Sequence, residues 1–89
     1  MEILQTPSFN RQAKKLHKNQ RKELEQAIRN IVSDPTLGKA KKGDLAGIHV
    51  YKFRMLNQLN LLAYQFYTSQ LVLVALGSHE NFHKHVNHH

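Results

Sequence analysis

Apolar residues recur at helical spacing in the first third of the chain, after a short segment that alternates like a strand. Residues 1–5 are predicted to form that strand. A first helix is predicted to begin at an N-cap, Ser8, and a second covers about 19–33. The second helix should end at Asp34-Pro35, because the residue before a proline avoids helical geometry. The apolar positions that line the two helices are Phe9, Ala13 and Leu16, then Leu24, Ala27, Ile28, Ile31 and Val32.

The second half of the chain has the period-two pattern of strands. Three strands are predicted, over about 47–55, 59–67 and 70–76, and residues 36–47 before them are predicted to be a basic loop. The polar pairs Asn57-Gln58 and Thr68-Ser69 are the predicted hairpin turns. The resulting order is strand, helix, helix and three antiparallel strands. It predicts an α+β fold in which an antiparallel two-helix hairpin packs on one face of the sheet, in a single domain over 1–89.

Alternation in the first of these three strands separates charged from aromatic side chains. Lys52 and Arg54 share one face with Ile48 and Val50. The other face holds His49, Tyr51, Phe53 and Met55. Burying two unpaired cations would cost too much free energy. We therefore expect the helices to cover the aromatic face and to leave Lys52 and Arg54 on the open face.

Charge and composition narrow the class of protein. The 89 residues include 13 Lys and Arg against 6 Asp and Glu, a net charge of +7, and seven histidines. This charge attracts polyanions such as RNA, although an acidic protein partner or a solvated surface would fit it too. The chain has no cysteine, no apolar stretch long enough to span a bilayer and no signal-peptide pattern at its start. We expect a cytoplasmic protein that does not associate with membranes.

The end of the last strand carries candidate chemistry. The apolar run at 71–76 ends on Gly77, and His79 and Phe82 follow closely. A histidine transfers protons near neutral pH, and an aromatic ring can stack on a nucleobase. Together with Lys52 and Arg54 they form a set that could hold and cut RNA. The alternative is an ordinary exposed cation pair, a surface histidine and a ring that packs against the sheet edge.

Four motifs follow one another along the chain: Gly-Asp-Leu-Ala-Gly at 43–47, Val-Tyr-Lys-Phe-Arg at 50–54, Leu-Leu-Ala-Tyr at 61–64 and Gly-Ser-His-Glu-Asn-Phe at 77–82. In this order they resemble the RelE/ParE superfamily of bacterial type II toxins. The resemblance spans essentially the whole chain. It implies the toxin of a toxin–antitoxin system, with a cognate antitoxin as partner and operator DNA bound only through the antitoxin complex.

The RelE side of this resemblance implies a ribosome-dependent mRNA endonuclease, or mRNA interferase, that inhibits translation. In that reaction the 2′-hydroxyl attacks the adjacent phosphate and no metal or cofactor is needed; the ribosome and mRNA would be partners. The ParE side implies a different activity, non-enzymatic inhibition of DNA gyrase. Lys52, Arg54 and His79 favour the endonuclease, whereas the missing third-strand arginine favours the inhibitor.

The resemblance also implies roles for individual residues. Lys52 and Arg54 match the paired basic residues of the family, His79 matches a catalytic arginine or histidine, and Phe82 matches a base-stacking ring. Some RelE members carry an arginine on the third strand, where this chain has Leu-Asn-Leu-Leu at 59–62. Asn60 could there bond a phosphate without neutralising it.

Two assignments stay open. Either Lys52 or His49 would have to remove the 2′ proton. Lys39, Lys41 and Lys42 either bind RNA or belong to a solvated loop. The histidines of the tail, from His83 onward, lack the cysteine or carboxylate that would complete a metal site, so no metal is expected.

Overall fold

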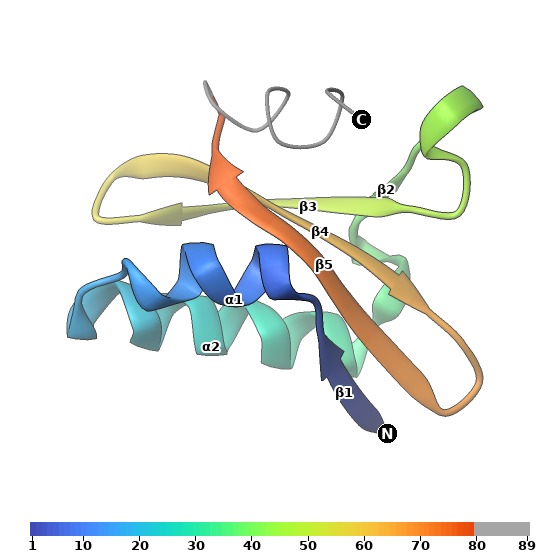
Figure 1. The fold of residues 1–89 in the computed structure, drawn as a ribbon, viewed down its shortest axis with the longest axis horizontal. Coiled ribbons are helices and arrows are strands. Elements are labelled where there is room, and N and C mark those ends of the chain that lie inside the picture. Colours follow the sequence, from blue (N-terminus) through green and yellow to red (C-terminus); the bar gives the residue numbers. More distant parts are fainter. Residues whose placement is uncertain (80–89) are drawn as a thin grey trace.

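Five strands form one mixed sheet in the order β1-β5-β4-β3-β2 in the computed structural model, which describes residues 1–79 (Figure 1). The edge strand β1 (Glu2–Gln5) runs parallel to β5 (Gln70–Ser78). All other neighbours are antiparallel: β5 with β4 (Gln58–Phe66), β4 with β3 (His49–Met55), and β3 with the two-residue β2 (Lys39–Ala40). Two helices follow β1 and cover one face of the sheet (Figure 1). The predicted α+β architecture is confirmed.

The two helices begin slightly earlier than predicted. Helix α1 (Pro7–Lys14) is capped by Thr6, whose Oγ1 accepts a hydrogen bond from the Phe9 N–H at 3.1 Å. The predicted cap, Ser8, is wrong, because Pro7 occupies the first helical position, where its fixed φ and missing N–H cost nothing. Helix α2 (Lys18–Ser33) ends before Pro35 as predicted. No helix within residues 1–79 is both long and apolar enough to cross a membrane.

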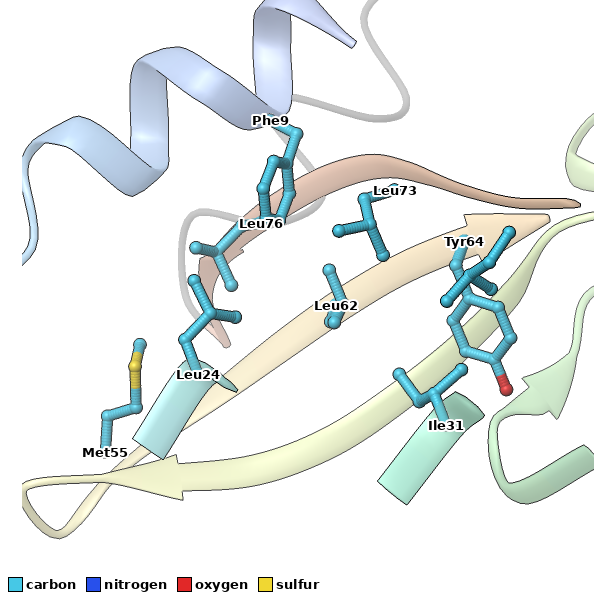
Figure 2. Close-up of a cluster of buried hydrophobic side chains, with 9 residues drawn as sticks. Phe9, Leu24, Ile31, Met55, Leu62, Tyr64, Leu73 and Leu76 are labelled. Atoms are coloured by element: carbon cyan, nitrogen blue, oxygen red, sulfur yellow. The ribbon is translucent and has the colours of Figure 1, made fainter. Parts of the chain in front are cut away.

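The main core lies between the helices and the sheet. Phe9 of α1 and Leu24 and Ile31 of α2 pack on side chains of β3, β4 and β5. Figure 2 shows these sheet residues as Met55, Leu62, Tyr64, Leu73 and Leu76. The aromatic face of β3 is thus the buried one, as the cost of burying cations predicted.

The segment between α2 and β3 is more ordered than the predicted loop. It contains a 3₁₀ turn, η1 (Pro35–Leu37), then β2, then a second 3₁₀ turn, η2 (Gly43–Leu45). The Tyr64 hydroxyl anchors it: it donates to the Pro35 carbonyl at 2.6 Å and accepts from the Gly38 N–H at 2.8 Å. A two-residue strand is too short to produce a period-two pattern, which is why sequence reasoning missed it.

One of the two predicted hairpin turns is confirmed and the other is shifted by one residue. The β4–β5 turn lies at Thr68 and Ser69 as predicted, and the Tyr67 N–H before it donates to the Gln70 carbonyl at 2.8 Å. The β3–β4 turn lies at Leu56 and Asn57, which both have positive φ (50° and 68°), as a two-residue turn of this hand requires. The prediction of Asn57-Gln58 was one residue late. The last strand also runs past Gly77, which was expected to end it, as far as Ser78.

A β-bulge interrupts the pairing of β4 with β5. Tyr64 is opposite Leu73 and Ala63 is opposite Ala75, so Val74 is the extra residue. Before the bulge, odd-numbered residues such as Leu71 and Leu73 face the helices; after it, even-numbered residues such as Leu76 do so. The bulge therefore reverses which face the end of β5 presents.

Candidate functional site

Lys52 and Arg54 lie on the sheet face turned away from the helices, and both side chains are exposed. In register, Lys52 is opposite Leu61 and Arg54 is opposite Leu59 of β4. Arg54 Nη1 donates to the Asn57 carbonyl at 3.3 Å, which leaves its other N–H groups available. Within residues 1–79, the Lys52 ammonium has no hydrogen-bond or ion-pair partner. Two cations are thus held on a strand, with their donors turned outward.

His79 joins this face because the bulge has reversed the alternation of β5. Its N–H donates to the Leu59 carbonyl at 3.1 Å, which continues the β4–β5 pairing by one residue. Arg54, Leu59 and His79 therefore form one row across three strands, and Lys52, Leu61 and Gly77 form the next row. Since neighbouring strands are about 4.8 Å apart, the Arg54 and His79 backbones are separated by roughly 10 Å.

A hollow of about 210 Å³ lies beside His79 at the end of the sheet. It is lined by Gln58, Leu59, Ser78 and His79. In the neighbouring row Gly77 contributes no side chain and is partly exposed, and Leu61 of β4 separates it from Lys52.

The remainder of the same face is apolar and closed. Val50, Leu61, Ala63 and Ala75 are each at most 5% exposed and cluster with Leu45 and Ile48. The sheet face turned away from the helices is therefore open at Lys52 and Arg54, as expected, but its centre is buried. The cations stand at the margin of an apolar surface, where charge interactions are less screened than in bulk water.

The basic segment extends this face beyond β3. Lys39 of β2 is opposite Val50, and the Lys41 N–H donates to the Ile48 carbonyl at 2.9 Å. Alternation places both lysines on the face of Val50, and hence of Lys52. Lys42 is exposed at the start of η2.

Asn60 does not belong to this group. It is opposite Phe53 and Ser78, on the helix side of the sheet, and only 6% exposed. Its Nδ2 donates to the Gln58 carbonyl at 2.9 Å. Asn60 and Lys52 leave the sheet from opposite faces, so the structure does not bring the predicted phosphate contact of Asn60 together with the two cations.

His49 is also on the helix side. Its ring stacks on Tyr64, with centroids 5.6 Å apart, and packs against Phe66 at 4.8 Å. Its Nδ1 is buried without a hydrogen-bond partner among the residues described. This placement puts His49 on the opposite face of the sheet from Lys52, Arg54 and His79. Phe82 and the histidines of the tail lie outside the described residues.

Comparison with known families identifies the chain. A family model described as the ParE-like toxin of type II bacterial toxin–antitoxin systems matches residues 3–87. The chain belongs to this family. The predicted RelE/ParE superfamily membership is confirmed, and the partner of such a toxin is its antitoxin. No curated protein sequence matches the chain.

Solved structures of related toxins share the fold. The YoeB/ParE toxin from Agrobacterium tumefaciens superposes with a TM-score of 0.71 at 23% identity, covering 89% of this chain and 99% of that one. A mutant of E. coli RelE in the free state gives 0.72 at 15% identity, covering 96% and 90%. RelE in the intact E. coli RelBE complex gives 0.67 at 15% identity, covering 85% and 93%.

Sequence reasoning missed two residues that shape the site. Val74 is the bulge residue, and Thr6 Oγ1 donates to its carbonyl at 2.6 Å. An apolar run such as 71–76 gives no sign of where one residue will be left out of register. The Thr6-Pro7 pair was the available signal for the cap, since threonine before proline is a standard helix start.

Proposed function

We propose that this toxin is a ribosome-dependent mRNA endonuclease whose active site is the face bearing Lys52, Arg54 and His79. The observation that carries the proposal is the shared face itself. Two cations of β3 and the imidazole of the residue that follows β5 occupy adjacent rows on either side of β4, and His79 lines a hollow at the end of the sheet. The basic residues Lys39 and Lys41 continue the same face and supply further contacts to RNA or ribosome.

The chemistry follows from these positions. The 2′-oxygen forms a bond to phosphorus and the bond from phosphorus to the 5′-oxygen breaks, which leaves a cyclic phosphate and a 5′-hydroxyl. Lys52 takes the 2′ proton in its neutral amine form, and so returns to its cationic form as negative charge develops on the phosphorane. Arg54 stabilises that charge through its remaining N–H donors, and the His79 imidazolium gives a proton to the leaving 5′-oxygen.

The test is a defined translation system with a ribosome stalled on a known codon. Wild-type protein should produce mRNA 5′ ends in the A site, mapped by primer extension, and His79→Ala should not. Lys22→Ala, which removes an exposed cation of α2, should cut like wild type. Absence of cleavage by the wild-type protein, on ribosomes shown to be stalled, would overturn the proposal.

The second candidate function is inhibition of DNA gyrase without cleavage. Two observations favour it: the matching family is described as ParE-like, and β4 carries leucines and Asn60 where a third cation would strengthen a nuclease. A supercoiling assay distinguishes the two. Under this alternative, wild type and His79→Ala inhibit gyrase equally and neither cuts mRNA.

A further inference from the structure

A second hollow lies on the helix side of the sheet, at the same end as His79. Its volume is about 250 Å³, and it is lined by residues of α1 and the turn after it, the start of α2, the end of β3, the first residues of β4 and the end of β5. None of the described residues that line it is acidic. Its polar lining consists of Gln12, Lys15, Gln20, Gln58, Asn60 and Ser78.

The amides in this lining are a recognition surface for a ligand with both donors and acceptors. Each side-chain amide carries two N–H donors and a carbonyl acceptor. Two of them are held in place: Asn60 by its bond to the Gln58 carbonyl, and Gln20 by accepting the His17 N–H at 2.9 Å. Asn60 Oδ1 has no hydrogen bond within residues 1–79. Fixed amides of this kind pair with the edges of nucleobases.

The rest of the lining suits a flat ring. Leu16, Met55 and Leu76 provide an apolar wall, and a methionine sulfur makes favourable contacts with aromatic rings. The volume falls just below the roughly 300–1,000 Å³ of sites for larger organic ligands. One planar base therefore fits better than an extended small molecule.

This pocket adjoins the hollow beside His79. Gln58 and Ser78 line both this pocket and the hollow beside His79. A strand of RNA whose phosphate lies at Lys52 and Arg54 can therefore pass His79 and turn over the end of the sheet. Lys15, the C-cap residue of α1, is exposed and lines this pocket, so it is placed to meet the next phosphate.

We propose that this pocket binds the nucleobase next to the scissile phosphate, with the amides of Gln12, Gln20 and Asn60 contacting the base edge and Lys15 the backbone. The inference rests on the proposed function, since it takes single-stranded RNA as the substrate. It adds a specificity site on the opposite side of the sheet from the cations. An acidic segment of a protein partner is the competing occupant.

The test uses the whole toxin and a five-nucleotide RNA with a 2′-deoxy nucleotide at its centre, which cannot be cut there. Titration of ¹⁵N-labelled protein should shift the side-chain amide signals of Asn60 and Gln12 saturably. By fluorescence anisotropy, the double variant Gln12→Ala, Lys15→Ala should raise the Kd at least about tenfold, the loss expected from one charged and one neutral hydrogen bond. The matched control Lys22→Ala, Gln26→Ala replaces the same residue types on α2 away from the pocket and should change the Kd less than threefold.

The outcomes separate this inference from the proposed function. If RNA shifts the Asn60 signals saturably but the protein cuts no mRNA, the nucleobase pocket is supported and the proposed endonuclease activity is rejected. If the wild type and the double variant Gln12→Ala, Lys15→Ala cut mRNA on the ribosome with the same KM, the endonuclease activity is supported and the nucleobase pocket is rejected. The pocket is also overturned if the wild type binds no RNA, or if the double variant loses affinity for the antitoxin and not for RNA.

Discussion

Arg54 and His79 flank Leu59 on one face of the sheet, Arg54 by cross-strand register and His79 through its N–H bond to the Leu59 carbonyl at 3.1 Å. The relationship depends on the bulge at Val74. With uninterrupted alternation, His79 would have continued the face of Leu71 and Leu73 and pointed toward the helices. One extra residue in β5 therefore decides whether the imidazole shares a face with the cations.

Replacing Lys52 or Arg54 with alanine should abolish most cleavage and leave the fold intact. Both side chains are exposed, so their loss removes no core packing. Removal of a donor that stabilises transition-state charge typically lowers the rate about 10²–10³-fold. The check is the single-turnover rate of A-site cleavage together with the melting temperature, with Lys22→Ala as the control for a lost surface charge.

Arg54→Lys refines that experiment. It keeps the positive charge but loses the planar pair of donors that binds a phosphate bidentately. We expect a rate between those of wild type and Arg54→Ala. If the loss of cleavage in Lys52→Ala and Arg54→Ala is accompanied by a matching loss of folded protein, seen as a large fall in melting temperature, the two residues support the fold and the active-site assignment is wrong.

The sequence predicted which face of β3 packs against the helices, because the opposite arrangement would bury two unpaired cations at a large cost in free energy. It offered Lys52, Arg54 and His79 as candidate site residues from residue type and order, and the structure brings the three onto one face of the sheet. It placed Asn60 with them by analogy, although simple alternation against Phe53 would have put it on the helix side. Val74 and the two-residue β2 escaped prediction, since each depends on tertiary pairing that leaves no local periodicity. The cap at Thr6 was missed although the Thr6-Pro7 pair is a local signal for a helix start.

Thr6→Ala should destabilise the protein more than loss of an ordinary helix cap. Its hydroxyl accepts from the Phe9 N–H and donates to the Val74 carbonyl, so one side chain caps α1 and holds the bulge. Loss of a cap costs about 0.5–2 kcal/mol, and an additional hydrogen bond costs about 1 kcal/mol. Urea unfolding should show a loss of about 2 kcal/mol for Thr6→Ala. Thr6→Ser, which keeps both bonds, should be close to wild type, and equal loss in both variants would show that the methyl group is what matters.

Tyr64→Phe should weaken the link between the sheet and η1. The Tyr64 hydroxyl is buried and bonds both the Gly38 N–H and the Pro35 carbonyl. Removing it leaves the N–H of Gly38 buried without this acceptor, which costs about 1–3 kcal/mol. The measurement is the free energy of unfolding in urea at neutral pH. An unchanged free energy of unfolding would mean that the two hydrogen bonds of the hydroxyl make no net contribution to stability.

The same residue predicts a pH dependence at the alkaline end. Burial raises the pKa of Tyr64 above its ordinary value of 10.0, against the opposing effect of the Gly38 N–H bond. The unfolded chain then loses the Tyr64 proton at a lower pH than the folded protein does. The contribution of the protonated hydroxyl to the free energy of unfolding is therefore complete below about pH 10, and it is lost as the pH rises through the higher pKa of the folded state. Wild type should lose more stability than Tyr64→Phe above pH 10, although the lysines titrate in both. Parallel curves would contradict the raised pKa.

Neutralising Lys39, Lys41 and Lys42 should reduce the salt dependence of binding to ribosomes. Lys39 and Lys41 extend the face of Lys52, and Lys42 is exposed at the start of η2. Each lysine that contacts a phosphate contributes about 1 to the slope of log affinity against log salt. The triple change to glutamine should lower that slope by about 2–3, measured by sedimentation with ribosomes at several salt concentrations. The control variant changes Lys18, Lys22 and Arg29 to glutamine, which removes the same charge from α2. An equal drop of the slope in both triple variants would assign the effect to net charge. An unchanged slope in the Lys39, Lys41 and Lys42 variant would mean that these three lysines are a solvated edge of the sheet.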